Sequence, residues 1–520
     1  MNSVSLDDYT RDLFETLFKP AEKSEPLSDM TAEVSALVKA AESEKLTGPI
    51  ITLFETLVRL RQDNGLTPDA FGLSKDKLLE LARKHQELDE HEVTIGGRVG
   101  KARGIVQSAN DRVDEYLSRH PVEAPSGIEL WDRIQGNMAR IRSELGIPKD
   151  DWNSFSGQLQ YAINDVDTLA RIVALPADAV TDVLRVTRKY RMRLTPYYAS
   201  LIMPGEMNDP ILLQSVPTGE MVDNVGEEIP PVAADHSPAR LIDQFYPRVV
   251  TIKATNMCAM YCTHCLRIAH IGKKDRIYSD AAYQEALDYI RANPRIRDVL
   301  ITGGDAFVLP NRIIAKLLAA LDEIDHVRLK RLGSRIPVTA PMRVDDELLD
   351  ILAQSNAKKP LRVVTQINTP REITPVSREA FRKLSNSASA VLNQAVLLRG
   401  INDSRVKMWK LCETIQESYV RPYYIFNCSY RNPQFAHLRV PLEKGRDIVE
   451  SMYGNISGDA IPRYIATAGG KIPLHRSNVE GYEGGMARLK KPWSGEMVNY
   501  PDADAEVYAA PAFAFKRYEH

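Results

Sequence analysis

The sequence predicts an α/β protein in which a partial (β/α) barrel follows an all-helical amino-terminal extension. Two observations carry this prediction. From residue 248 onward, short apolar runs alternate six times with helical patterns, as in repeated βα units around a parallel sheet. Before residue 148, apolar residues instead recur at the spacing of amphipathic helices. At 520 residues, the chain has room for about three or four domains or for one barrel with additions.

The expected strands share a continuous apolar character, which is typical of strands buried on both faces of a parallel sheet. They cover residues 248–254, 297–302, 327–332, 361–367, 390–398 and 420–427. Helical patterns lie between them, at 280–294, 311–324, 346–355, 378–387 and 406–418. In such a barrel the chemistry belongs to the loops after the carboxyl ends of the strands.

The sequence outside the barrel suggests three further parts. Residues 1–148 form the helical extension, in which 30–38, 48–63 and 75–88 carry helical patterns; it either packs on the catalytic part or mediates self-association. Residues 149–238 combine short helices with an irregular stretch rich in Pro, Tyr and Asn, which we expect to wrap the barrel. The barrel then takes residues 239–455, and a carboxy-terminal segment takes residues 456–520.

The composition limits the classes of partner. Charged residues make up 26% of the chain and hydrophobic residues 44%, with a net charge of −2, so we expect neither nucleic acid nor an anionic membrane as the principal partner. The amino terminus has early acidic residues and lacks the apolar core of a signal peptide. No run of eighteen apolar residues occurs, and a cytoplasmic location is therefore expected.

Three of the five cysteines, Cys258, Cys262 and Cys265, fall within eight residues after the first predicted strand. Thiolates this close in sequence converge from a loop, and soft sulfur ligands suit an iron–sulfur cluster. A [4Fe–4S] cluster held by three thiolates keeps one iron open for a small molecule. The alternative is a zinc site completed by His264 or His270. Disulfides are disfavoured by the odd, small number of cysteines.

The loop after the second predicted strand carries Gly303, Gly304 and Asp305. Glycines there allow polar groups of a ligand to approach the backbone, and the carboxylate of Asp305 can bond a ribose hydroxyl or an ammonium group. A turn without a ligand is the simpler alternative, but the position after a barrel strand favours a binding role.

Two further strand ends carry polar residues. The third strand ends in Gly333, Ser334 and Arg335, which either contribute to the site or cap a following helix. The fifth strand contains Asn393 and Gln394, which either face the barrel interior or bond to the backbone.

Lys471 follows Gly469 and Gly470 directly and precedes a turn stiffened by Pro473. If this lysine lies in a crowded apolar site, desolvation lowers its pKa and frees the neutral amine for a Schiff base. Most lysines beside paired glycines are exposed loop residues, so the residues alone leave both interpretations open.

From roughly Trp152 to Gly484 the chain resembles the lysine 2,3-aminomutase family, which are radical S-adenosylmethionine (SAM) enzymes that also use pyridoxal phosphate. The Cys-x3-Cys-x2-Cys spacing is specific to the radical SAM superfamily. The stretches that carry the closer resemblance are LTPYYASLI, NDPILLQSVPT, MCAMYCTHCLR, ITGGDAFVL, GSRIPV, LNQAVLLRGIND, VRPYYIFNCS and GGKIPL. The first 140 or so residues lie outside it.

The resemblance implies a role for each candidate residue. Cys258, Cys262 and Cys265 would bind the [4Fe–4S] cluster, whose open iron binds SAM. Gly303, Gly304, Asp305 and Ser334 would lie against SAM, Lys471 would hold pyridoxal phosphate as a Schiff base, and Arg267 would pair with the substrate α-carboxylate. Arg248 is the nearest candidate for the cofactor phosphate, because the family's phosphate-binding arginines are out of register here.

The implied reaction moves the α-amino group of an amino acid to Cβ. One electron from the cluster cleaves SAM to a 5′-deoxyadenosyl radical, which abstracts a hydrogen from Cβ; the nitrogen migrates, and the hydrogen returns. The cofactors supply the chemistry, and the barrel aligns them and excludes water. The resemblance also implies an electron donor such as flavodoxin or ferredoxin and a homo-oligomer.

The substrate is expected to differ from lysine. In lysine-acting members, two aspartates bind the distal ammonium group; here Ser429 replaces one, and Ala466 or Thr467 occupies the place of the other. Neither neutralises a buried cation. Arg431 lies close in sequence and suits an acidic side chain, and a neutral polar amino acid is equally open. The rival classes are a radical SAM enzyme without pyridoxal phosphate and a non-catalytic zinc-binding relative.

Overall fold

The computed structural model describes residues 17–18, 26, 28–43, 48–86, 90–225, 236–271 and 274–504. The chain divides into two compact units, Met1–Asp114 and Glu115–His520. Helix α5, Glu90–Glu123, contributes residues to both units. Residues 226–235, at the end of the predicted irregular stretch, lie outside the described residues, and the domain boundaries at 148, 238 and 455 stay predictions.

The amino-terminal unit is helical where it is described, which confirms the fold expected for the extension. Its elements are α2 (Ser28–Ser43), α3 (Gly48–Asn64), η1 (Pro68–Phe71) and α4 (Lys75–Gln86). Apolar residues at helical spacing meet in one buried cluster, which includes Val34, Leu53, Leu57, Leu60, Leu78 and Leu81. The stripe read from the sequence is therefore the face that the helices bury against one another.

The second unit is built on a curled nine-stranded sheet in which the strands follow one another in chain order from β1 to β9. Strands β2 to β8 are parallel, and the two edge strands β1 and β9 are antiparallel to their neighbours. The six central strands match the predicted strands within two residues at each end: β2 Val249–Thr255, β3 Asp298–Gly303, β4 Leu329–Gly333, β5 Leu361–Thr365, β6 Ala390–Leu397 and β7 Arg421–Asn427.

Three strands of this sheet were not predicted: β1 (Ile242–Tyr246), β8 (Arg463–Thr467) and β9 (Lys471–Pro473). Each has five residues or fewer and none has a long continuous apolar run, and their pairing with β2, β7 and β8 comes from the folded sheet. The backbone N–H of Lys471 on β9 donates to the hydroxyl of Tyr246 on β1 at 3.1 Å. This hydrogen bond links the two edge strands of the curled sheet.

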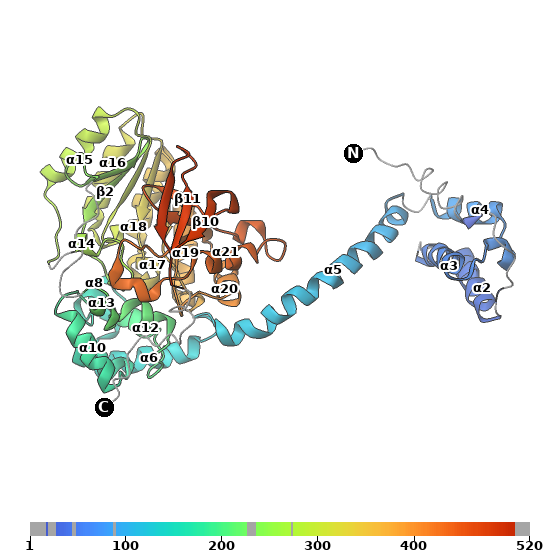
Figure 1. Ribbon diagram of the computed structural model, residues 1–520, viewed down its shortest axis with the longest axis horizontal. Helices are drawn as coiled ribbons and strands as arrows, with labels where there is room; N and C mark the ends of the chain where they lie inside the picture. Colours follow the sequence, from blue (N-terminus) through green and yellow to red (C-terminus); the bar gives the residue numbers. More distant parts are fainter. Residues whose placement is uncertain are drawn as a thin grey trace. The chain divides into compact units, whose positions relative to one another are not determined.

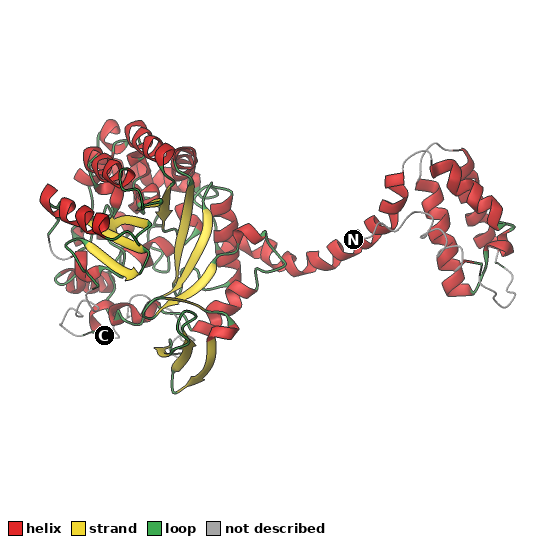
Figure 2. Cartoon of the chain, turned by 90° about the horizontal axis from the view of Figure 1, so that it is seen from above, coloured by secondary structure: helices red, strands yellow, loops and turns green. Residues whose placement is uncertain are grey.

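Helices cover the outer face of the sheet, and Figure 2 shows the strands lying between them. Four of the six begin at a side-chain cap: Ser279, Asp345, Thr374 and Ser404 each accept a backbone N–H of the first turn. The six helices are α15 Asp280–Ala292, α16 Asn311–Asp322, α18 Asp346–Lys358, α19 Pro375–Ser387, α20 Arg405–Gln416 and α21 Leu442–Glu450 (Figure 1).

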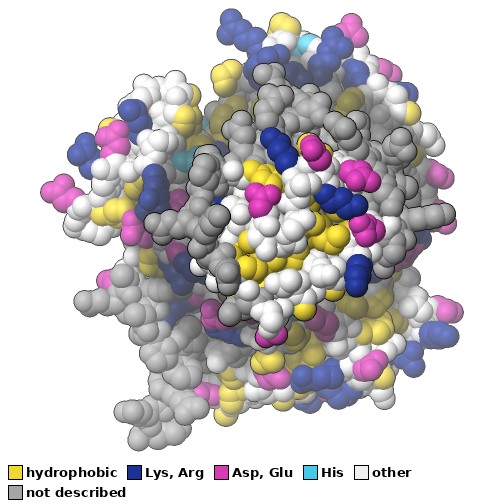
Figure 3. All heavy atoms as spheres, turned by 90° about the vertical axis from the view of Figure 1, so that its right-hand side faces the viewer, with side chains coloured by type: hydrophobic (Ala, Val, Ile, Leu, Met, Phe, Trp, Pro, Cys, Tyr) yellow, Lys and Arg dark blue, Asp and Glu magenta, His cyan; other side chains and the backbone are white. Residues whose placement is uncertain are grey.

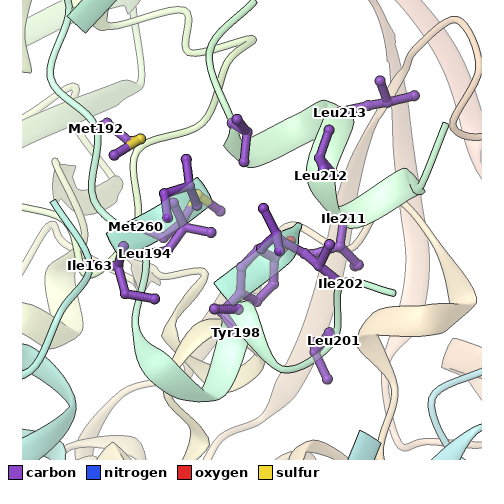
Figure 4. Close-up of a cluster of buried hydrophobic side chains, with 14 of the residues drawn as sticks. Ile163, Met192, Leu194, Tyr198, Leu201, Ile202, Ile211, Leu212, Leu213 and Met260 are labelled. Carbon is purple, nitrogen blue, oxygen red and sulfur yellow. The ribbon is translucent and has the colours of Figure 1, made fainter. Parts of the chain in front are cut away.

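Residues 124–225, here called the pre-barrel segment, join α5 to the region before the sheet. Their helices are α6 Trp131–Glu144, α7 Lys149–Trp152, α8 Phe155–Gln160, α9 Val166–Val173, α10 Ala177–Thr187, α11 Pro196–Ala199, α12 Pro210–Ser215 and α13 Glu220–Asp223. Their apolar side chains form a buried cluster that also takes in Met260 from the cysteine loop and Phe435 (Figure 4). The segment therefore packs directly against the part of the barrel that carries the predicted chemistry.

A separate three-stranded antiparallel sheet follows, with β10 Val479–Glu483, β11 Met486–Lys490 and β12 Met497–Pro501. No helix among the described residues is both long and apolar enough to cross a membrane. On the face drawn in Figure 3, cationic and anionic side chains are interspersed, in keeping with the net charge of −2.

Candidate active site

The three motif cysteines lie in the loop that follows β2, at the carboxyl end of the parallel strands. The pre-barrel segment supports this loop from behind. The backbone N–H of Tyr261 donates to the Arg193 carbonyl at 3.2 Å, and that of Thr263 donates to the Gln214 carbonyl at 3.1 Å. Met260 is 4% exposed within the apolar cluster of that segment (Figure 4). The loop is therefore held by contacts far away in sequence.

Gly303 and Gly304 lie directly against the backbone at the start of the cysteine loop. The Gly304 N–H donates to the Thr255 carbonyl at 2.5 Å, and the Asp305 N–H donates to the Met257 carbonyl at 2.8 Å. A Cβ at either glycine would collide with one of these two carbonyl oxygens, and Gly303 has a φ of +115°. The glycines thus give the cysteine loop its close approach to β3; their role toward SAM stays a prediction.

The Asp305 carboxylate is buried and accepts backbone hydrogen bonds from the next strand end. It accepts the N–H of Arg335 at 2.6 Å, that of Ile336 at 3.2 Å and that of Phe307 at 2.9 Å. Burial raises its pKa above the ordinary value, and the hydroxyl of Ser334 and these amides oppose that shift. Asp305 therefore joins the loops after β3 and β4, a role that sequence reasoning missed.

The cysteine thiols lie in a half-buried environment with one cation at contact distance. Burial raises the pKa of Cys265 to about 12 and the pKa of Cys258 well above its ordinary value. The Arg335 guanidinium donates from Nη1 to the Cys262 sulfur at 2.9 Å. Metal ligation requires thiolates, and a nearby guanidinium stabilises that form.

Both histidines considered for a zinc site have partners in the protein. His264 Nε2 lies 3.3 Å from the amide nitrogen of Asn368, and burial, with the charge of Arg335, lowers the pKa of His264 to about 3. His270 Nε2 lies 3.2 Å from the Thr255 carbonyl. Among the described residues, no three His, Cys, Asp or Glu side chains group as ligands of a single metal ion.

Arg267 is half-buried and lies between the cysteine loop and β3. Its Nη1 donates to the Thr302 hydroxyl at 3.4 Å. Its positive charge also lowers the pKa of the Cys258 and Cys265 thiols, against the larger effect of burial. The guanidinium therefore lies beside the predicted cluster loop; pairing with a substrate carboxylate stays a prediction.

Lys471 lies on β9 with its amino group over aromatic rings of β7. Nζ is 4.9 Å from the ring centroid of Tyr424 and 5.7 Å from that of Phe426. Burial, assisted by the positive charge of Arg331, lowers the pKa of Lys471 to about 8, while Asp298 opposes this shift. The lysine is thus desolvated, and about a tenth of its amine is neutral at pH 7, far more than in an ordinary lysine.

Strand register defines the face that Lys471 shares. Thr467 is its direct partner across β8 and β9, so their side chains lie on the same face, whereas Ala466 pairs with Ile472 on the other face. Arg331 pairs directly with Arg362, and Arg331 donates to Asp298 at 2.8 Å. Sequence reasoning missed Tyr424, Phe426 and Arg331. The available signal was that polar or aromatic residues are interspersed with aliphatic ones within β4 and β7, two strands predicted to be continuously apolar.

Three further candidate residues from the sequence lie near strand ends, two just after β7 and one just before β2. Ser429 is buried just after β7, and its hydroxyl accepts the backbone N–H of Arg431 at 3.3 Å. Arg431 itself is exposed, with Nε donating to the Tyr430 hydroxyl at 3.4 Å. Arg248 is exposed before the amino-terminal end of β2, the end opposite the cysteine loop.

Asn393 and Gln394 on β6 take opposite positions. Asn393 is 2% exposed and brackets the backbone of Ile367 with two hydrogen bonds, from the Ile367 N–H at 2.8 Å and to its carbonyl at 3.0 Å. Gln394 is half-buried and pairs with Tyr424 across β7, on the face that carries Lys471. The backbone-bonding interpretation therefore holds for Asn393, and the interior position stays a prediction for Gln394.

Comparison with known proteins identifies the family. Residues 252–409 match the radical SAM superfamily. Glutamate 2,3-aminomutase from Clostridioides difficile (strain 630) is 37% identical over 398 residues, which are 76% of this chain and 93% of that protein. L-lysine 2,3-aminomutases from Methanococcus maripaludis and Clostridium subterminale are 38% and 36% identical, over 62% of this chain and 76% and 78% of their own lengths. The chain belongs to the radical SAM 2,3-aminomutase family.

Membership in this family of isomerases implies a [4Fe–4S] cluster and SAM, and the site fits both groups. Three soft sulfur donors lie in one supported loop. Beside them, two buried donor atoms, Gln214 Nε2 and Arg335 Nε, have no hydrogen-bond partner within the described part of the chain. Such buried donors are expected to face an acceptor, and cluster sulfides and the SAM carboxylate are acceptors. The family match also favours the cluster over the zinc alternative.

Proposed function

We propose that this protein is a pyridoxal phosphate-dependent 2,3-aminomutase that acts on an acidic amino acid, with glutamate as the first candidate. The observation that carries the proposal is the setting of Lys471, whose amino group lies over Tyr424 and Phe426 with its pKa lowered to about 8. A lysine that forms a covalent bond to an aldehyde must be partly neutral at working pH. An ordinary exposed lysine is almost entirely protonated there.

Each residue of the site has a task in this proposal. Cys258, Cys262 and Cys265 hold the cluster, and Lys471 holds pyridoxal phosphate, which supplies a π system that stabilises the rearranging radical. Arg267, beside Thr302 at the barrel mouth, orients the substrate through its α-carboxylate. The curled sheet and the pre-barrel segment keep water from the reacting atoms. Gly303, Gly304 and Ser334 contribute to the SAM site by shaping the loops after β3 and β4.

The setting of Lys471 also suits the cofactor. Aromatic rings below the amine offer an apolar surface for a flat heteroaromatic ring. Arg331 and Arg362 lie side by side on the face that carries Tyr424, and their guanidinium groups are suited to a phosphate or carboxylate. We assign the cofactor phosphate to this inner face, with Arg248 as the alternative.

The substrate assignment rests on charge. By the resemblance, Ser429 and either Ala466 or Thr467 replace the aspartates of lysine-acting members, and of the last two Thr467 shares the face of Lys471. Without a carboxylate there, a buried distal ammonium group is left uncompensated, which is costly. The glutamate 2,3-aminomutase matched over 93% of its length supports an acidic substrate. A neutral polar amino acid, bound through the Ser429 hydroxyl, is the second candidate.

The test is an anaerobic assay of the reconstituted protein with SAM, pyridoxal phosphate and a reductant, offering each common amino acid separately. We expect a β-amino acid from glutamate and a rate at least about tenfold lower from lysine. Product from a neutral polar amino acid alone would move the assignment to the second candidate. Exclusive turnover of lysine contradicts the substrate proposal, and the absence of any product contradicts the aminomutase proposal for free amino acids.

Two variants sharpen this assay. Arg431→Ala lowers the rate with glutamate if that arginine receives the distal carboxylate, and an unchanged rate would show that Arg431 does not receive it. The double variant Ser429→Asp with Thr467→Asp restores two carboxylates, and we expect it to gain lysine turnover by about tenfold while losing glutamate turnover. If the protein were a radical SAM enzyme without pyridoxal phosphate, the wild type would lack an absorption band that depends on Lys471.

A further inference from the structure

The Arg335 guanidinium contacts the sulfur of a cysteine in the radical SAM motif. Its Nη1 donates to Cys262 Sγ at 2.9 Å, and the side chain is only 8% exposed. Arg335 lies after β4, seventy-three residues from this cysteine in sequence. A buried cation at a thiolate is a strong electrostatic contact, because little water is present to screen it.

The other end of the same guanidinium is fixed by acceptors from three separate segments. Nη2 donates to Glu372 Oε1 at 2.8 Å, to the Tyr198 hydroxyl at 3.1 Å and to Gln214 Oε1. These acceptors lie on η4 (Pro370–Glu372), α11 and α12. Because all three acceptors are buried, the guanidinium has no alternative position that keeps its hydrogen bonds.

Glu372 is itself held in place. Its Oε2 accepts the backbone N–H of Asn368 at 2.7 Å and that of Thr369 at 3.2 Å, so the carboxylate is anchored to the loop after β5. Glu372 neutralises the buried charge of Arg335. Its carboxylate contacts the guanidinium at Nη2 only, so Nη1 remains available to donate to the sulfur. The positive edge of the arginine is therefore aimed at the predicted cluster.

We propose that Arg335 is a positioning residue that donates a charge-assisted hydrogen bond to the Cys262 thiolate and thereby raises the reduction potential of the cluster. A donor to a ligand sulfur stabilises the reduced cluster, which carries one more negative charge, more than the oxidised cluster. Electron transfer from the donor protein then becomes easier. The inference rests on membership in the radical SAM family and not on the substrate or on pyridoxal phosphate.

The test is a redox titration of the reconstituted cluster, monitored by electron paramagnetic resonance without SAM or amino acid. Arg335→Gln removes the charge, and we expect the equilibrium constant for one-electron reduction to fall about tenfold, a potential about 59 mV more negative. Arg343→Gln is the matched control: Arg343 is also buried, but its side chain donates to the carbonyls of Phe307 and Leu309. Its potential should equal that of the wild type at equal iron and sulfide content.

Tyr198→Phe keeps the proposal testable if Arg335→Gln fails to retain its cluster. This variant keeps the charge but removes one of the acceptors that hold Nη2, so the guanidinium is held less firmly at the sulfur and we expect a smaller shift in the same direction. Unchanged potentials in every variant that retains full iron and sulfide overturn the proposal. So does a weaker affinity for SAM at unchanged potential, which would assign Arg335 to SAM binding. An inactive enzyme with the expected shift contradicts only the proposed aminomutase reaction.

Discussion

The cysteine loop and the Lys471 strand lie in one barrel but are organised by different forces. Around the cysteines, directed hydrogen bonds join distant segments: Arg335 alone spans Cys262, Glu372 and Tyr198. Around Lys471, the main contacts are two aromatic rings and the pairing of two short strands. The first arrangement fixes the position of ligands, whereas the second changes the chemistry of one amine through desolvation. Mutations should therefore be able to impair the cysteine loop without affecting Lys471, and the reverse.

The largest effect is expected from removing one reactive group at a time. Lys471→Ala should abolish the absorption band of pyridoxal phosphate bound to Lys471. It should also lower activity by at least about 10³-fold, with iron and sulfide content unchanged. Cys262→Ser should lose the cluster and keep the absorption band. Metal analysis measures the cluster content of both variants, and visible spectroscopy measures the absorption band of bound pyridoxal phosphate. Loss of both groups in either variant would show that the two regions are one cooperative site.

Glycine substitutions should distinguish the two regions by stability. Gly304→Ala forces a Cβ onto the Met257 carbonyl, and we expect a loss of about 2 kcal/mol in unfolding free energy together with poor iron retention. Gly470→Ala places a Cβ 2.6 Å from the Trp493 ring at a φ of +147°, and should instead impair the binding of pyridoxal phosphate. Denaturant titration of both variants compares them.

Gly458→Ala is the control for these two variants, since nothing lies within 4 Å of its Cβ position. Its stability should stay within about 0.5 kcal/mol of the wild type. Equal stability of Gly304→Ala and Gly458→Ala would contradict the role of Gly304 in seating the cysteine loop.

The pH dependence of pyridoxal phosphate attachment should report the desolvation of Lys471. With a pKa of about 8, the neutral fraction rises about tenfold from pH 7 to pH 9 and then levels off. Because the unfolded lysine has an ordinary pKa near 10.5, the folded state binds fewer protons between pH 8 and 10.5, and this group's contribution to stability rises with pH there. Absorbance after rapid mixing, with Lys471→Ala as blank, measures the profile. A rise that continues past pH 10 contradicts it.

The smallest expected effect is electrostatic. Arg331→Gln removes a positive charge that lowers the pKa of Lys471, so the inflection of the attachment profile should move to higher pH, and this pH shift is read separately from any loss of amplitude caused by removing a proposed phosphate-binding arginine. Arg328→Gln, a change outside the strand, serves as the comparison and should leave the inflection in place. An unmoved inflection in Arg331→Gln would leave burial as the sole cause of the shift.

Local patterns were sufficient for much of this molecule. The six central strands and the helices between them were predictable because continuous apolar runs alternate there with helical patterns. The cysteine loop was placed correctly after the first of these strands because its spacing is local. Edge strands β1 and β9 were missed because they mix polar and apolar residues and contain no long continuous apolar run, and they form by pairing with neighbours that come together only in the folded sheet.

By itself, the sequence determined the class of fold, the cysteine motif and the identity of the candidate lysine. Only the tertiary structure decided that Thr467 and not Ala466 shares the face of Lys471, that Asp305 ties two loops together, and that Arg335 reaches Cys262. The physical reason is that spacing along a chain encodes period and ligand type, whereas strand register, desolvation and contacts between remote side chains exist only after the segments have packed.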